Sequence, residues 1–263
     1  KKIGKLGDIY INDAFSCSHR KQASIHGITK FVKVAYAGPL LKKEITAIES
    51  VVKNKKEPVT CIIGGSKIST KITVISNLIK SASNIIIVGA MANNFLKYKN
   101  YEIGKSLKEN NSSEIIKKII YEAEKSKCKI IIPEDCMVSK SFEGHGVAKD
   151  LKSIEKDDII LDVGPKTLKT IEKIIDSSNT VMWNGPAGYY ENKSYAVGTN
   201  FKAEKISENT EKKSLISVLG GGDTVSAINK SGLKLSFTHL STAGGAFLEY
   251  LEGKDLPGLS VLK

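Results

Sequence analysis

Beyond Pro58 the chain alternates between short apolar runs and longer amphipathic stretches, the pattern of successive βα units. The apolar runs are continuously hydrophobic, as expected of strands buried on both faces of a parallel sheet. Most intervals have helical spacing, as in SSEIIKKIIYEAEKSK and PKTLKTIEKIIDSS. We therefore predict one α/β domain with a doubly wound parallel sheet, whose strands cover 59–63, 85–89, 129–132, 159–163, 180–183, 215–219 and 237–240.

A different pattern precedes Pro58. GDIYIND, at 7–13, is strand-like, and the polar turn AFSCSHRKQ follows it. Gly38-Pro39 then opens a segment with proline at its start, as is common in the first turn of a helix. The apolar residues of this segment fall on one helical face: Leu41, Ile45, Ile48, Val51 and Val52. We predict an amphipathic helix over 38–55.

The composition is that of a soluble globular protein: the 263 residues are 41% hydrophobic and 26% charged. No apolar stretch approaches the roughly 18–20 residues of a membrane span, and nothing has the pattern of a signal peptide. We expect a cytoplasmic protein with no membrane partner. Because the chain starts at Lys1 instead of methionine, we expect a processed chain or a fragment of a longer one.

The four cysteines, Cys17, Cys61, Cys128 and Cys136, show no CxxC spacing. Three of them lie in or beside apolar, strand-like runs. Buried, reduced thiols are therefore expected, and neither a disulfide framework nor a zinc site.

The net charge of +12 raises the question of a nucleic-acid partner. Among the 40 basic residues there is one arginine, Arg20, and the lysines are scattered along the chain. Aromatic residues make up 6%, with no basic–aromatic interleaving that would stack bases. We therefore expect no nucleic-acid partner, and a preference for small polyanionic substrates.

The stretch LISVLGGGDT, at 215–224, has the pattern of a phosphate-binding turn. An apolar run leads into three glycines, and Asp223 and Thr224 open a helical segment. Glycines let backbone amides approach an anion, and a helix N-terminus adds partial positive charge. Asp223 is placed to reach a metal ion carried on those phosphates. The alternative is an ordinary strand–helix turn with a capping aspartate.

A second glycine turn, GGSKISTKI at 64–72, follows the first strand of the α/β region. We expect Ser66 or Ser69 to cap a helix here. Lys67 and Lys71, four residues apart, would then share one face of its first turn. Two lysines there oppose the helix dipole, which is easier to understand if a polyphosphate binds. Two solvated lysines are the alternative.

Other strand ends carry small or polar residues that could surround a nucleotide. WNGPAG (183–188) leads to Glu191, which could accept hydrogen bonds from ribose hydroxyls or be a plain surface carboxylate. GAMANNFL (89–96) and LDVG (161–164), with Leu107, could enclose a purine ring or simply pack as loops.

Two further segments could bind a second anion. Arg20 is the last residue of INDAFSCSHR, and its planar guanidinium can form two parallel hydrogen bonds with a carboxylate or phosphate. The neighbouring His19 could act as a base, although a structural role is the commoner one. STAGGAFLEYLEG (241–253) is another glycine-rich helix start, with Ser241 or Thr242 as cap and Gly244 and Gly245 in the first turn. Two such anion sites favour a transferase that joins two phosphorylated ligands.

These segments, in this order, resemble the phosphoglycerate kinase family: LGDIYINDAF…SHR, GPLLKKEI, GGSKISTKI, WNGPAG, GGGDT and STAGGAFLEYLEGKDLPG. The resemblance runs almost from end to end of the chain, and it is specific as a set. It implies a two-lobed kinase, monomeric when intact, with a Rossmann-like C-terminal lobe that binds ADP or ATP with Mg²⁺. The N-terminal lobe would bind 3-phosphoglycerate or 1,3-bisphosphoglycerate.

The resemblance also implies roles for single residues. Lys71 would follow the transferred phosphoryl group, with Gly221 and Gly244 as further catalytic positions. Arg20, Gly244 and Gly245 would bind the phosphoglycerate, and Asp223 would meet Mg²⁺. With the motifs above, the expected nucleotide-binding residues are Gly65, Lys67, Lys71, Gly89, Leu107, Leu161, Asn184, Pro186, Glu191, Gly220, Gly221, Gly222, Asp223 and Thr224.

The sequence departs from the family in length. The family pattern would place most of an N-terminal lobe before Lys1, including most acceptor-site arginines. We therefore expect residues 1–37 to be the end of that lobe, 38–55 an interdomain helix, 56–240 the nucleotide-binding domain, and 241–263 a helix and tail returning towards the lobe. Val88 and Ala90, where glycines are usual, are smaller departures.

Three hypotheses follow. The first is an N-terminally truncated glycolytic phosphotransferase that binds MgADP or MgATP and transfers phosphate poorly. The second is a catalytically silent nucleotide-binding remnant of such a kinase. The third, a dinucleotide oxidoreductase, is disfavoured because no GxGxxG follows the first strand.

Overall fold

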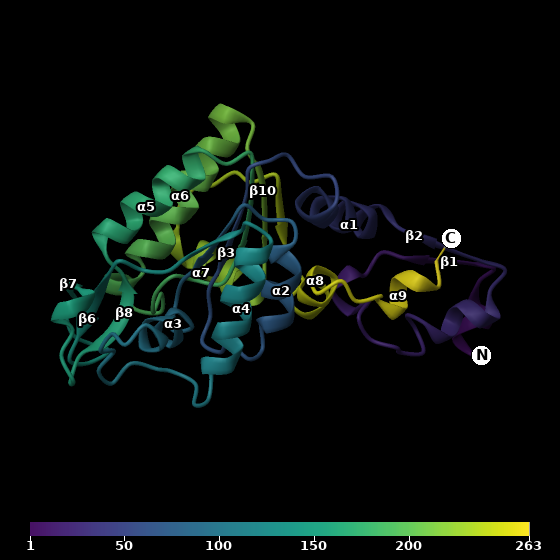
Figure 1. The fold of residues 1–263 in the computed structure, drawn as a ribbon. Helices are drawn as coiled ribbons and strands as arrows, with labels where there is room; N and C mark the ends of the chain where they lie inside the picture. The colour runs from purple at the N-terminus through teal and green to yellow at the C-terminus, as the bar shows by residue number, and fades with distance from the viewer. Residues whose placement is uncertain (263) are drawn as a thin grey trace.

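A computed structural model describes residues 1–262 of the chain. Its centre is a six-stranded parallel sheet in the order β11-β10-β9-β3-β4-β5 (Figure 1). This confirms the predicted α/β class and six of the seven predicted strands. The strands are β3 (Val59–Ile63), β4 (Asn84–Ile87), β5 (Lys129–Ile131), β9 (Thr180–Asn184), β10 (Ile216–Gly220) and β11 (His239–Ser241).

Helices cover both faces of this sheet (Figure 1). One face is packed by α1, α2, α4 and α8, and the other by α5, α6 and α7. Proline opens both α1 and α5, directly after a glycine, as the sequence pattern predicts. The helices are α1 (Pro39–Val52), α2 (Ile72–Ile79), α3 (Ala92–Tyr98), α4 (Ser113–Lys125), α5 (Pro165–Asp176), α6 (Val197–Lys213), α7 (Gly222–Ser231), α8 (Gly245–Leu251) and α9 (Pro257–Ser260).

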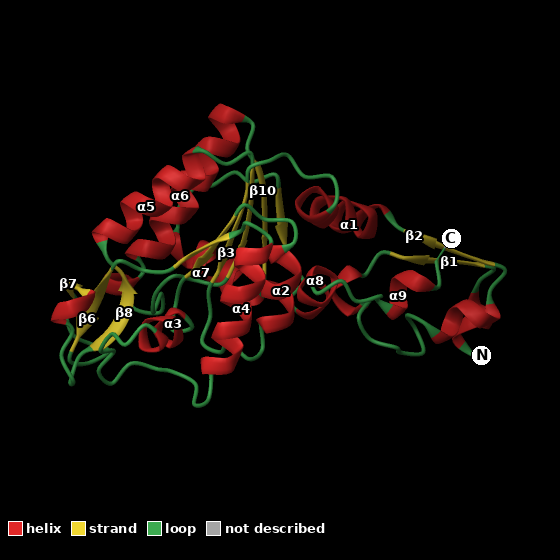
Figure 2. Ribbon diagram, viewed as in Figure 1, coloured by secondary structure: helices red, strands yellow, loops and turns green. Residues whose placement is uncertain are grey.

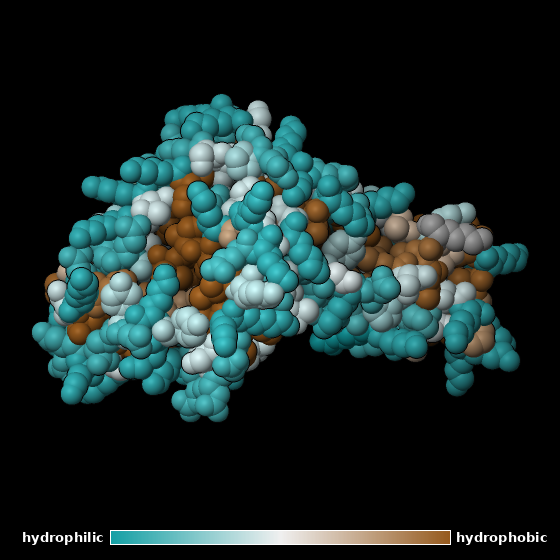
Figure 3. Space-filling view, viewed as in Figure 1, coloured by the Kyte–Doolittle hydropathy of each residue, from teal (hydrophilic) through white to brown (hydrophobic). Residues whose placement is uncertain are grey.

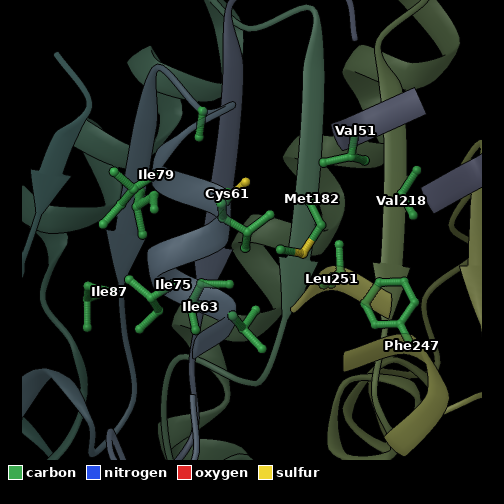
Figure 4. Close-up of a cluster of buried hydrophobic side chains, with 14 of the residues drawn as sticks. Val51, Cys61, Ile63, Ile75, Ile79, Ile87, Met182, Val218, Phe247 and Leu251 are labelled. Atoms are coloured by element: carbon green, nitrogen blue, oxygen red, sulfur yellow. The ribbon is translucent and has the colours of Figure 1, made fainter. Parts of the chain in front are cut away.

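Alternate residues of each buried strand point to opposite faces, which explains the continuous apolar runs. In β3, Cys61 and Ile63 join the core under α1, α2 and α8, whereas Ile62 joins the core on the other face. Figure 4 shows the first of these cores, with Phe247 and Leu251 of α8 packed beside Met182.

The predicted strand at 159–163 exists but lies outside the central sheet. It is β8 (Ile159–Val163), in a three-stranded antiparallel sheet of order β7-β6-β8 that stands apart from the central one (Figure 2). Its partner β6 (Asp135–Ser139), and β7 (Val147–Asp150) on the other side of β6, are absent from the sequence prediction. The strand was predicted correctly, but its place in the central parallel sheet was wrong. β8 is apolar because it packs in local cores with Cys136, Val138 and Tyr195. An apolar run alone does not specify which strands it pairs with.

The strand order reverses between β3 and β9. From β3 the chain adds β4 and β5 on one side, and it later returns to add β9, β10 and β11 on the other. Ligands of doubly wound sheets bind at such a switch point, outside the carboxyl ends of the strands.

The N-terminal segment and the C-terminal tail pack together at one end of the molecule (Figure 1). β1 (Ile9–Asn12) pairs in parallel with β2 (Val34–Ala37), a strand that the sequence analysis missed. Asn12 Nδ2 donates to the Gly258 carbonyl at 3.0 Å, and the Gly258 amide donates to the Ser18 carbonyl at 2.8 Å. The N-terminal segment and the C-terminal tail are thus joined by hydrogen bonds. The domain boundaries predicted after residues 37, 55 and 240 remain predictions.

One face of the β1–β2 pair is uncovered. Ile9 and Ile11 are 61% and 60% exposed, and Tyr36, which is opposite Ile11 in the register, is 46% exposed. Figure 3 shows hydrophobic surface over this end of the molecule. No helix within residues 1–262 has both the length and the apolar character needed to cross a membrane.

We predict that this apolar face drives self-association, because its burial between copies removes apolar surface from water. Sedimentation velocity of the chain should show association that increases with concentration. The double substitution Ile9→Lys/Ile11→Lys should reduce it. Val147→Lys, at a residue of β7 that is 60% exposed, is the control and should leave association unchanged. A native chain that stays monomeric at all concentrations contradicts the prediction.

Candidate functional site

The loops after β3 and β9 meet at the switch point. The Gly64 amide donates to the Asn184 carbonyl at 2.7 Å, so the two loops lie against each other. A Cβ atom on Gly64 would clash with the carbonyl of Pro186, and Gly65 has φ +124°. The approach therefore requires the two glycines, as the GG turn of the sequence suggests.

Lys71 lies at the centre of this junction. Its Nζ donates to the Gly64 carbonyl at 2.6 Å and to Asn184 Oδ1 at 2.5 Å. Burial lowers the pKa of Lys71 to about 8, against the opposing effect of the Asp223 carboxylate. The ammonium is therefore mostly charged at pH 7 and positioned between two loops.

The predicted shared helical face of Lys67 and Lys71 is wrong, because α2 begins only at Ile72. Residues 66–71 form bends and turns instead, and neither serine caps the helix. The Ser69 amide and hydroxyl bind the Glu109 carboxylate, at 2.9 and 2.5 Å. Lys67 is exposed on this loop. Although desolvation acts to raise the pKa of Glu109, the bonds from Ser69 and the charge of Lys67 hold it below its usual value.

The GGGDT turn adopts the predicted strand–turn–helix conformation. β10 ends at Gly220, Gly221 has φ +102°, and α7 begins at Gly222. The Thr224 hydroxyl accepts from the Gly185 amide at 2.7 Å and donates to the Gly220 carbonyl at 3.0 Å. This ties the turn to the loop after β9.

The first turn of α7 is open to a ligand. Space for a side chain is free at Gly222, and Asp223 is exposed. Asp223 makes no capping hydrogen bond, so the capping alternative does not hold. The first amides of a ten-residue helix lack partners within the helix and favour an anion.

A cavity of about 300 Å³ extends from this turn along the carboxyl ends of β3, β4 and β9. Gly89, with φ +69°, lets the loop after β4 approach Gly65. Half of the expected nucleotide-binding residues line the cavity: Gly65, Gly89, Leu107, Leu161, Pro186, Glu191 and Asp223. Lys71, Asn184, Gly220 and Thr224 do not line the cavity, but their hydrogen bonds join the loops beside it, and Gly221 and Gly222 lie in the turn after β10.

The antiparallel sheet supplies wall residues that the sequence analysis missed. Cys136 of β6 and Phe142 of the β6–β7 loop line the cavity. The Phe142 ring packs edge-on against Tyr189, with 5.3 Å between ring centroids. Asn93 of α3 is another wall residue. The short DCMVS run that forms β6 is a weak sequence signal for its part of the wall, whereas Asn93 lies in the GAMANNFL run that the sequence analysis placed beside a possible purine.

The second predicted anion site forms a separate group around the start of α8. Gly244 precedes the helix, and a Cβ atom on Gly245 would lie 2.9 Å from His19 Nε2. Arg20 Nε donates to the same nitrogen at 3.4 Å. Arg20 thus lies beside His19, which packs against Gly245, whereas no atom from the rest of the described chain lies within 4 Å of a Cβ position on Gly244. Within residues 1–262, neither Ser241 nor Thr242 caps α8, which corrects that expectation.

Beside the cavity lies a buried acid–base pair that sequence reasoning did not single out. Asp162 lines the cavity and accepts from the Val163 and Gly198 amides at 2.9 and 2.7 Å. Burial raises the pKa of Asp162 to about 7. Lys202 is fully buried, and burial lowers its pKa to about 7, against the Asp162 charge. Its Nζ lies 4.5 Å from the Trp183 ring centroid and has no hydrogen-bond partner among the described residues.

Comparison with known proteins gives a consistent result. The phosphoglycerate kinase family model matches residues 1–254. A phosphoglycerate kinase of Wolbachia pipientis wMel is 44% identical over 100% of this chain and 66% of its own length. That of Francisella tularensis subsp. novicida is 41% identical over 100% of this chain and 67% of its own. The chain thus spans about two thirds of these relatives.

Solved structures agree in fold. The phosphoglycerate kinase from Coxiella burnetii superposes with a TM-score of 0.93 at 37% identity, over 99% of this chain and 66% of that one. The enzyme from Pyrococcus horikoshii gives 0.82 at 29% identity, over 99% and 65%.

Lys202 should cost stability, because its ammonium is buried without a hydrogen bond. Its pKa falls from 10.5 to about 7 on folding, so the unfolded chain binds more protons between those values. The free energy of unfolding therefore rises with pH between about 7 and 10.5 on account of Lys202, and the destabilisation caused by its buried ammonium is largest below pH 7. We expect Lys202→Met to raise the free energy of unfolding by about 1–2 kcal/mol at pH 6, and by less at pH 9.

Urea unfolding at the two pH values measures this effect. At pH 6 the Asp162 carboxyl is mostly protonated, so removal of the ammonium leaves no buried charge behind. Lys205→Met is the matched control: Lys205 lies on the same helix but pairs with Glu172 and Asp176, at 3.1 and 3.3 Å. The control should give no gain. A loss of stability at both pH values for Lys202→Met contradicts the prediction.

Proposed function

The chain belongs to the phosphoglycerate kinase family, and on that premise we propose that it is the nucleotide-binding part of a glycolytic phosphotransferase. The reaction is reversible phosphoryl transfer between 1,3-bisphosphoglycerate with ADP and 3-phosphoglycerate with ATP. The chain spans about two thirds of its curated relatives, so this activity belongs to the proposal.

One observation carries the proposal: a charged lysine, a glycine turn at a helix start and a cavity meet at one sheet edge. Lys71 is hydrogen-bonded into the junction, and Asp223 lies on the cavity rim next to the open Gly222. A nucleoside diphosphate fits this combination, since its phosphates need amides and positive charge while its base needs an apolar slot.

The ligand orientation follows from these surroundings. The phosphates would lie at residues 221–224, where the α7 amides are open. The base would enter between the walls formed by Gly65, Gly89, Leu107, Leu161 and Pro186. The exposed carboxylate of Glu191, at the rim of the cavity, would then accept hydrogen bonds from the ribose hydroxyls.

Asp223 has the surroundings that a magnesium ligand needs. Mg²⁺ is usually held by one or two carboxylates together with substrate phosphates and waters, and Asp223 offers one exposed carboxylate beside the phosphate turn. When bound with the nucleotide, Mg²⁺ would neutralise phosphate charge. Lys67, exposed on its loop, could reach the same phosphates from the side of β3.

Lys71 would stabilise charge on the phosphoryl group during transfer. Its amine is held by Gly64 and Asn184 and stays mostly protonated at neutral pH, so it is positioned before the ligand arrives. An acyl phosphate is already activated, and no general base is needed. Positioning and charge neutralisation, with Gly221 at the turn, would carry the catalysis.

The acceptor would bind around Arg20, Gly244 and Gly245, where the α8 start packs against His19. This group offers one guanidinium for a ligand that carries a carboxylate and a phosphate. We propose that the acceptor site is incomplete in this chain, so that it transfers phosphate poorly on its own. The second candidate is a catalytically silent ADP- or ATP-binding remnant.

Asp223→Asn should weaken MgADP binding by about tenfold, because an amide is a poorer Mg²⁺ ligand than a carboxylate. Isothermal titration with ADP in the presence of EDTA should show a much smaller change or a gain, since a negative charge beside the phosphates is removed. Glu134→Gln, a carboxylate outside the cavity, is the control. Equal losses with and without Mg²⁺ would assign Asp223 to the phosphates or the fold instead of the metal.

Phosphoryl transfer separates the two candidate functions. We expect the 263-residue chain alone to be at least about 100-fold slower than the intact Wolbachia relative, since it matches 66% of that relative's length and its proposed acceptor site offers one guanidinium. Adding the part of that relative which this chain does not match, as a separate polypeptide, should raise the rate. A Lys71→Met chain should not be rescued.

Full-rate turnover by the chain alone would contradict the incomplete acceptor site. Nucleotide binding without any rescue would favour the silent remnant.

A further inference from the structure

Glu109 joins two segments that lie 40 residues apart in the sequence. Its Oε2 accepts from the Ser69 amide at 2.9 Å, and its Oε1 accepts from the Ser69 hydroxyl at 2.5 Å. Ser69 belongs to the β3–α2 loop, residues 64–71, whereas Glu109 lies between α3 and α4. We call this two-point contact the Ser69–Glu109 clamp. Because both oxygens of a charged acceptor take part, the clamp fixes the orientation of the loop as well as its distance.

The clamp is anchored to a helix. The Glu109 amide donates to Asn94 Oδ1 at 2.8 Å, and Asn94 is 2% exposed in α3. Two residues before Glu109, the Leu107 carbonyl accepts from Asn93 Nδ2 at 2.9 Å. Two buried amides of α3 thus hold the backbone from which the Glu109 side chain extends. Through Glu109, Ser69 is tied to this helix.

The clamped loop carries Lys67. Gly65 and Ser66, directly before this lysine, line the cavity. Directly after it, Ile68 is fully buried in the core and Ser69 is held by the clamp. The lysine, which is itself exposed, therefore lies between residues of the cavity wall and the two anchors of the loop.

We propose that Glu109 is a positioning residue for the nucleotide phosphates: by binding Ser69 it holds the β3–α2 loop so that Lys67 stays at the edge of the cavity. This inference rests on the proposed nucleotide function, in which Lys67 reaches the phosphates. Glu109 does not line the cavity, so it acts through the lysine and not by contact with the ligand. An exposed loop that loses an anchor samples other conformations, which places its cation less often near the anion.

The charge of Glu109 and its hydrogen bonds have opposite effects on an anion. Against desolvation, the bonds from Ser69 and the charge of Lys67 lower the pKa of Glu109, so the lysine and the carboxylate interact. The negative charge by itself repels phosphates and attracts the lysine away from them. The clamp, in contrast, favours phosphate binding. The sign of the change in affinity therefore separates the two effects.

Three variants make this separation in calorimetric titrations with MgADP. Glu109→Gln removes the charge but keeps an acceptor for the Ser69 amide and a donor for its hydroxyl, so ADP should bind as in the native chain or up to about threefold more tightly. Glu109→Ala removes charge and clamp, and should weaken ADP binding by about fivefold. Ser69→Ala keeps the charge and removes one bond of the clamp, and should weaken binding by about twofold to threefold.

Glu102→Ala is the matched control. Glu102 Oε1 accepts from the Ile103 and Gly104 amides, both at 2.9 Å, so this carboxylate also binds two donors but stays within its own segment. The control should bind MgADP as the native chain does.

Adenosine, which carries no phosphate, gives a readout that a general structural role would not give. Because the clamp acts through Lys67, Glu109→Ala should change the affinity for adenosine by less than about twofold. Equal losses for ADP and adenosine would assign Glu109 to the base slot, through Leu107, and overturn the proposal. So would unchanged or tighter ADP binding by a folded Glu109→Ala chain.

The possible failures are distinguishable. If the native chain does not bind MgADP, the proposed function fails and the positioning role fails with it. If the native chain binds MgADP but Glu109→Ala and Ser69→Ala bind it equally well, only the positioning role fails. Thermal unfolding followed by circular dichroism shows whether Glu109→Ala folds. If it does not, the comparison of Ser69→Ala with Glu102→Ala decides the matter.

Discussion

The rest of the site depends on the close approach of two backbones, after β3 and after β9. Gly64 and Gly185 lie so near each other that a side chain on either would meet the opposite main chain. The hydrogen bond from the Gly64 amide to Asn184 holds the approach, and Thr224 extends it to the turn after β10. Because strand order reverses here, three consecutive strand ends converge where the sheet leaves a crevice.

The contact between the β3 and β9 loops also fixes the position of the Lys71 ammonium. Asn184 uses both ends of its amide, accepting from Lys71 and donating to Gly220. The lysine is thus tied to the β3 and β9 loops, and the asparagine connects it to the phosphate turn. Partial burial lowers the Lys71 pKa but leaves it charged at neutral pH, so the cation is held in low-dielectric surroundings where it acts more strongly on an anion.

Much of the fold and the turns could be predicted, since they depend on local pattern. The GGGDT turn follows from glycine backbone freedom, and α1 from its apolar face and opening Gly-Pro. The antiparallel pairing of β8 could not be predicted, because an apolar run does not determine which strand pairs with it. Nor could the loop conformation of Lys67 and Lys71: spacing of four suits a helix, but Ser69 bonds to Glu109, 40 residues away.

The sequence alone therefore determined the family, the strand-end location of the chemistry and the glycines that it requires, because these are encoded in contiguous residues. Only the tertiary structure decided which side chains meet: Lys71 with Asn184, Asn93 with Leu107, and Lys202 with Trp183. These contacts join residues from different elements. Whether a buried amide or ammonium finds a partner depends on packing in three dimensions, which no local pattern records.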